Sequence, residues 1–141
     1  NKLNKMESKS IQQLNLILLT LEDINASITH LKNWNAGVQD FLALEATEEG
    51  LQKLAADAML IEAIGEGVKQ LDKRTEGKLF SKQPDIPWDL VIGMRDRIAH
   101  GYFGLDIGYI EDVILNDIDP LQNAIKSLMQ YVKGLIDKNT N

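Results

Sequence analysis

Apolar residues recur every three or four positions along most of the chain, the spacing of helices that bury one face. This pattern predicts a first helix from Ser10 to about Trp34 and a second from Thr47 to about Leu79. A turn at Asn35–Gly37 and a short helical piece separate the two. No stretch alternates apolar and polar residues for long enough to predict a strand.

Prolines mark the remaining helix boundaries. The linker Gln83–Trp88 contains two prolines and predicts a third helix from Pro87 to about Tyr102. A fourth helical region runs from Ile107 to about Asn116, and Asp119–Pro120 suits the N-cap and first turn of a last helix. We therefore predict an all-α fold, an up-and-down four-helix bundle with a short extra helical segment.

The length of 141 residues predicts one domain, which we place at residues 8–138. The opening NKLNK is polar, and we expect residues 1–7 to form a flexible N-terminal tail with Met6 as the natural start. The chain has no cysteine, which excludes disulfides and thiol catalysis. The apolar run Leu16–Leu19 is too short to span a bilayer, so we expect no membrane association and a cytoplasmic location.

Two glycines interrupt the second predicted helix. Gly65 and Gly67 each lower the stability of a helix, because glycine has the greatest backbone freedom to lose. Their presence predicts that another backbone approaches this helix closely.

The net charge of −6 counts against a free-standing nucleic-acid binder, which is usually basic. The stretch from Lys69 to Gln83 differs, because its five cations outnumber two carboxylates by three. Two readings remain open. The stretch is either a solvated helix face or a basic rim that guides an acidic polymer toward a site.

The stretch MRDRIAHGYFGLD, residues 94–106, gathers a guanidinium, an imidazole and a phenol within eight residues. The helical neighbours of Arg95 are all apolar: Val91, Ile92, Ile98 and Ala99. A charged guanidinium among apolar residues is costly unless a partner or ligand meets it. Arg95 is therefore either a structural arginine paired with Glu62 or Glu66 of the second helix, or an anion-binding residue.

His100 follows Asp96 by four residues, so the carboxylate can accept a hydrogen bond from the ring and favour its charged form. The C-terminal end of a helix also favours a cation. Both effects predict a raised pKa for His100, which suits a group that donates a proton near neutral pH. The alternative is a histidine that only caps the helix.

Arg95 and His100 are separated by about 140 degrees around an ideal helix, so they do not share a face. Two protomers packed about a two-fold axis could combine their halves into one site. We therefore expect a homodimer with its site at the interface.

The spacing Arg95-x4-His100-x-Tyr102 resembles the signature of the HEPN superfamily, specifically its HepT-like ribonuclease toxin branch. Ile64-Gly65-Glu66, the Ile86-Pro87-Trp88 linker and Ile92-Gly93-Met94-Arg95 resemble that branch in order and spacing, and the similarity covers roughly residues 8–138. Asp96 departs from the pattern, because asparagine is frequent there.

The resemblance implies a dimeric endoribonuclease that needs no metal or other cofactor. Arg95 would bind the scissile phosphate of an RNA substrate and His100 would act as general acid or base, with Asp96 and Glu66 in support. The resemblance also implies a partner, an MNT-type nucleotidyltransferase antitoxin that transfers AMP onto Tyr102. Simple packing at a helix end is the alternative for Tyr102. The alternative function is a HEPN bundle that no longer cleaves and only binds nucleotide, RNA or a partner protein.

Overall fold

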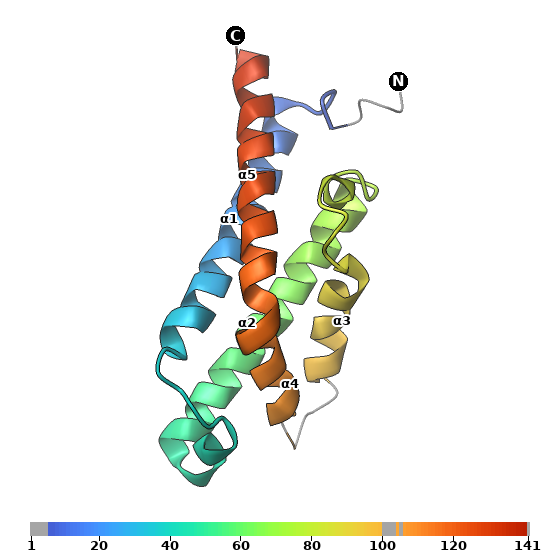
Figure 1. Cartoon of the computed structure of the whole chain (residues 1–141). Helices are drawn as coiled ribbons and strands as arrows, with labels where there is room; N and C mark the ends of the chain where they lie inside the picture. Colours follow the sequence, from blue (N-terminus) through green and yellow to red (C-terminus); the bar gives the residue numbers. More distant parts are fainter. Residues whose placement is uncertain (1–5, 100–103, 105, 141) are drawn as a thin grey trace.

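The computed structural model describes residues 6–99, 104 and 106–140, and the chain folds as an up-and-down bundle of four long helical units (Figure 1). The described residues form no strand, so the prediction of an all-α fold is confirmed. The helices are α1 (Ile11–Trp34), α2 (Glu48–Arg74), α3 (Trp88–Ala99), α4 (Ile107–Asp112) and α5 (Ile118–Thr140). Short 3-10 helices lie at Leu42–Ala46 and Phe80–Lys82.

The first two helices begin where their polar caps predict. Ser10 accepts a hydrogen bond from the backbone of Gln13 while the Gln13 side chain accepts one from the backbone of Ser10, a capping box. Thr47 caps α2 in the same way through the backbone N–H of Gly50. The buried stripe of α1 then packs against both α2 and α5, and α2 also packs extensively against α3.

The second helix ends at Arg74, five residues before the predicted end at Leu79. Thr75 donates its hydroxyl to the carbonyl of Leu71 at 2.8 Å, and Glu76 and Gly77 adopt φ values of +52° and +76°. These left-handed residues reverse the chain, as they commonly do after a helix. Leu79 is buried beyond this reversal, so its apolar character extended the predicted helix too far.

The helical break predicted at Asp119–Pro120 is wrong, because the chain from Ile107 to Thr140 is continuously helical. A π-helical turn, Val113–Asp117, joins α4 to α5. Pro120 lacks an N–H and its ring crowds the carbonyl four residues earlier, so a regular α-helix cannot pass through this position unchanged. The wider π turn immediately before Pro120 accommodates it without ending the helix.

The core contains two features that the sequence pattern did not reveal. Met6, which we expected in a flexible tail, is only 4% exposed and packs with the core. Asp57 of α2 is fully buried and accepts a hydrogen bond from the side chain of Asn35 at 2.8 Å. Within the described part of the chain, no helix is both long and apolar enough to cross a membrane.

Candidate functional site

Arg95 lies where the backbone of α3 closely approaches α2. A Cβ atom built on Gly65 would lie 2.8 Å from the backbone N of Arg95 and 3.0 Å from the carbonyl O of Val91. The predicted backbone approach is therefore confirmed at Gly65. At Gly67 it is wrong, because the nearest atoms belong to the side chain of Ile24.

Two carboxylates hold the guanidinium of Arg95. Its Nε lies 2.9 Å from Oε2 of Glu66, close enough for an ion pair although the direction is not that of a hydrogen bond. Its Nη1 donates to Oδ1 of Asp96 at 3.3 Å. Of the two glutamates considered as partners for Arg95, Glu66 therefore makes the contact.

The position of Arg95 remains compatible with an anion ligand. The side chain is 42% exposed, and among the described residues no partner faces its third nitrogen, Nη2. A guanidinium can engage a phosphate through two parallel N–H groups. Against this, the two neighbouring carboxylates offset its charge, so an incoming phosphate must compete with Glu66 and Asp96.

His100 and Tyr102 lie outside the described residues, so the expected hydrogen bond from His100 to Asp96 and the place of Tyr102 stay predictions. Of the predicted site residues, the structure brings together Arg95, Asp96 and Glu66. The remaining two belong to the segment that connects α3 to α4.

A cluster that we did not predict joins the end of α3 to the start of α4. Nη2 of Arg97 in α3 lies 3.3 Å from Oδ2 of Asp106. The same guanidinium lies over the ring of Tyr109, with its Cζ 4.2 Å from the ring centroid. Asp106 also caps α4 by accepting from the backbone N–H of Tyr109 at 3.0 Å. This hydrogen bond first, and Arg97 second, lower the pKa of Asp106 below its usual value.

The Arg97–Asp106–Tyr109 cluster holds together two positions that are nine residues apart in the sequence. The signal available in the sequence was Asp106 directly before a helical pattern, a position typical of an N-cap. The sequence did not reveal that Arg97 would reach it.

The basic stretch begins one helical turn after Glu66 and leads away from Arg95. It covers the end of α2 and the following 3-10 helix, at the opposite end of the bundle from the end of α3 (Figure 1). All five of its cations are exposed: Lys69, Lys73, Arg74, Lys78 and Lys82. Lys82 also lies over the ring of Tyr131, 4.4 Å from the centroid, so it is partly engaged within the fold.

Comparison with known proteins finds relatives that are named as ribonucleases. A protein of Caldanaerobacter subterraneus subsp. tengcongensis named "Putative RNase" is 37% identical over 73 residues, which cover 52% of this chain and 62% of that protein. A "Putative RNase" of Methanocaldococcus jannaschii is 31% identical over 81 residues, covering 57% of this chain and 61% of its own length. The chain thus spans about three fifths of these relatives.

A third relative is covered more fully. The "Probable ribonuclease HepT" of Thermococcus cleftensis is 28% identical over 111 residues, which are 77% of this chain and 91% of that protein. No solved structure matches the chain significantly. The family model described as "Ribonuclease HepT-like" matches residues 21–128, a range that includes Glu66, Arg95 and the whole connecting segment. The chain belongs to the HepT-like ribonuclease family.

Proposed function

We propose that this protein is an endoribonuclease toxin of a HEPN–MNT toxin–antitoxin system, and that it cleaves RNA without a metal ion. The observation that carries the proposal is the setting of Arg95 in a chain of the HepT-like ribonuclease family. Its guanidinium is fixed against Glu66 at 2.9 Å, is half-exposed, and has Nη2 directed at no described residue.

In the proposed reaction the ribose 2′-oxygen attacks the adjacent phosphorus while the bond from phosphorus to the 5′-oxygen breaks. The products are a 2′,3′-cyclic phosphate and a 5′-hydroxyl. Arg95 binds the non-bridging oxygens and stabilises the charge that develops on them in the transition state. His100 transfers a proton, either from the attacking 2′-hydroxyl or to the leaving 5′-oxygen.

Glu66 and Asp96 position Arg95 in this proposal. A guanidinium that is already oriented loses less side-chain entropy when it binds a phosphate. The same carboxylates repel the phosphate, so the site depends on added positive charge. A protonated His100 would supply it.

The test compares degradation of total cellular RNA by the wild-type protein, His100→Ala and His30→Ala. His30 is the matched control because it is the other histidine of the chain and lies on the exposed face of α1, stacked on Trp34. We expect His100→Ala to lose at least about a hundredfold in rate, the size typical of a lost acid–base group, and His30→Ala to cleave normally. If wild type and His100→Ala leave the RNA equally intact, the protein is not a ribonuclease.

A second candidate function is a HEPN bundle that binds nucleotide, RNA or a partner protein without cleaving. The observation that favours it is the pair of carboxylates on Arg95, together with the net charge of −6. Gel-shift assays distinguish the two functions. A protein that retards RNA with the same affinity in wild type and His100→Ala, and cleaves it in neither, is a binding module.

We further propose that the active form is a cytoplasmic homodimer, with the site completed between two protomers. The sequence spacing of Arg95 and His100 predicts that they diverge on an ideal helix, so one chain would not easily direct both at one phosphate. Light scattering on the active protein tests this. A strictly monomeric protein with full activity would contradict the dimer and leave the ribonuclease proposal intact.

The antitoxin in this proposal is an MNT-type nucleotidyltransferase that transfers AMP from ATP onto the hydroxyl of Tyr102 and releases pyrophosphate. The added phosphate would place negative charge near Arg95, where RNA phosphate is proposed to bind. Intact mass after coexpression should show added AMP in the wild-type protein and in Tyr131→Phe, and none in Tyr102→Phe. Persistence of the adduct in Tyr102→Phe would move the modification elsewhere.

A further inference from the structure

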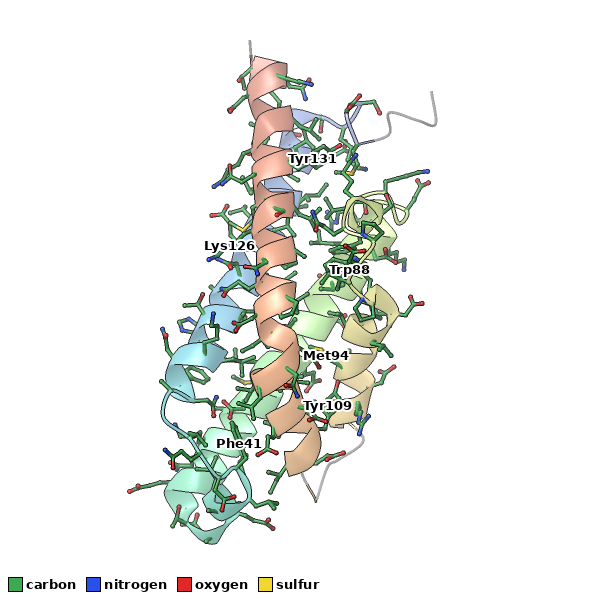
Figure 2. The ribbon with its side chains drawn as sticks, viewed as in Figure 1. Phe41, Trp88, Met94, Tyr109, Lys126 and Tyr131 are labelled. Carbon is green, nitrogen blue, oxygen red and sulfur yellow. The ribbon has the colours of Figure 1, made fainter. Side chains whose placement is uncertain are left out.

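The side of α3 that faces away from α2 borders an apolar groove. The groove has a volume of about 410 Å³ and lies between α3 and the continuous helix formed by α4, the π turn and α5. Met94 from α3 and Tyr109 from α4 both line it (Figure 2). Its floor consists of buried apolar side chains: Val91, Met94, Val113, Ile118 and Leu121.

The rim of the groove is apolar and acidic. Leu90 stands at the edge of the groove with 71% of its surface exposed. Asp85, Asp89 and Asp117 also line the groove, and none of the three pairs with a cation among the described residues. Among the described residues no cation compensates the charge of Asp117, and burial first, with the nearby Asp112 second, raises its pKa above the usual value.

Arg97 does not supply that compensation. It is the cation among the described lining residues, but it is held by Asp106 and by the ring of Tyr109. The groove therefore presents an apolar floor with an excess of negative charge at its edge. RNA is excluded as its occupant, because three carboxylates repel phosphates.

We propose that this groove binds an amphipathic helical segment of a different protein, with apolar residues on one face and lysine or arginine at its edges. The wall of the groove from Trp88 to Arg97 is ~15 Å long, which fits about three turns of a helix. Apolar residues of the partner cover Leu90 and the floor, and its cations neutralise Asp89 and Asp117.

The main basic stretch of a second copy does not match the groove. This stretch, residues 69–83, contains none of the exposed large apolar side chains found among the described residues. Those exposed side chains lie elsewhere: Leu16, Leu19, Trp34, Leu42, Leu51, Met59, Leu90 and Leu115. We therefore assign the groove to a partner of different sequence, and occupancy by a second copy is an outcome that the experiment detects.

The experiment uses the full chain and a fluorescein-labelled helical peptide of about 12 residues, ~18 Å long, with leucines spaced by three and four and lysines at both edges. A matched peptide carries glutamate in place of every lysine. Fluorescence anisotropy should detect binding of the lysine peptide and none of the glutamate peptide. Amide shifts in the labelled protein should map to residues 85–97 and 109–121.

The decisive variant is Asp89→Lys/Asp117→Lys, which reverses two charges at the groove. Its matched control is Glu22→Lys/Glu45→Lys, which makes the same change in net charge at exposed positions of α1 and the first 3-10 helix. We expect the groove variant to weaken the lysine peptide at least about tenfold and the control variant less than about twofold. Equal losses in both variants would reveal general attraction to an acidic protein and overturn the proposal.

Two further results would also overturn it. One is the absence of binding by the lysine peptide. The other is a wild-type dimer that Leu90→Asp converts to monomer, which would show that another copy of the chain occupies the groove. Because Leu90 is exposed, we expect this change to leave the fold intact. None of these outcomes depends on whether the protein cleaves RNA.

Discussion

Replacing Gly65 by alanine places one methyl group where α2 and α3 are in contact. The new Cβ would lie 2.8 Å from the backbone N of Arg95, 3.0 Å from the carbonyl O of Val91 and 3.4 Å from the Cβ of Arg95. The two shortest contacts are with backbone atoms, which cannot rotate away as a flexible side chain can. To reach an ordinary separation, α3 must shift by about 0.6 Å at the residue that carries the candidate guanidinium.

The magnitude follows from two opposing effects. Overpacking of this kind costs about 1–3 kcal/mol. Alanine in place of glycine inside a helix returns about 0.5–1 kcal/mol. We therefore expect Gly65→Ala to lower the free energy of unfolding by up to about 2.5 kcal/mol, with a central value of about 1 kcal/mol, and the Tm by roughly 3 °C at that value.

Urea and thermal unfolding followed by circular dichroism measure this effect, with Gly134→Ala as the matched control. Gly134 is exposed in α5, and a Cβ there meets nothing within 4 Å, so its substitution should stabilise by about 0.5–1 kcal/mol. Gly65→Ala should also reduce RNA cleavage, because the shift displaces the backbone that carries Arg95. A Gly65→Ala protein that gains as much stability as Gly134→Ala would refute the close approach of the two helices.

Three further substitutions test other contacts. Burial raises the pKa of Asp57, so the carboxyl holds its proton more tightly in the folded protein than in the unfolded chain. The stabilisation from this proton is complete below about pH 4, and it is lost as the pH rises through the pKa of Asp57 in the folded protein. Asp57→Asn keeps the contact with Asn35 and should reduce the difference in the free energy of unfolding between pH 4 and pH 7, measured with urea. An unchanged difference would contradict the raised pKa of Asp57. Glu66→Gln removes one of the charges opposing a ligand of Arg95 and should tighten RNA binding about two- to fivefold in the non-cleaving His100→Ala background; weaker binding would contradict this. Asp106→Ala removes the cap of α4 and should cost about 1 kcal/mol in urea unfolding, whereas no loss would show that the cap is dispensable.

The sequence allowed most of the fold to be predicted because its signals are local. Ser10 and Thr47 begin helices through hydrogen bonds to residues three positions away, and such contacts are readable from spacing. The end of α2 was not predicted because Glu76 adopts a left-handed backbone conformation, which is uncommon for glutamate. The continuity through Pro120 was missed because a π turn has no reliable residue signature.

Some contacts of the candidate site could also be predicted from the sequence, and others could not. Arg95 and Glu66 could be proposed as partners, since a charged residue among apolar neighbours requires a counterion and Glu66 lies on the helix predicted to pack nearby. Arg97 could not be linked to Asp106 and Tyr109, because that contact depends on how α4 returns alongside α3. The buried pair of Asn35 and Asp57 was also missed, since neither residue type indicates burial.

The most direct test of the account is single-turnover RNA cleavage by Arg95→Ala, because Arg95 is the proposed phosphate ligand. Arg95→Lys retains the charge without the paired N–H groups, and Lys126→Ala removes one exposed cation of α5 as the matched control. The account predicts that Arg95→Ala loses about 100- to 1000-fold in rate, that Arg95→Lys recovers part of it, and that Lys126→Ala cleaves normally. Cleavage by Arg95→Ala at the wild-type rate would contradict the account.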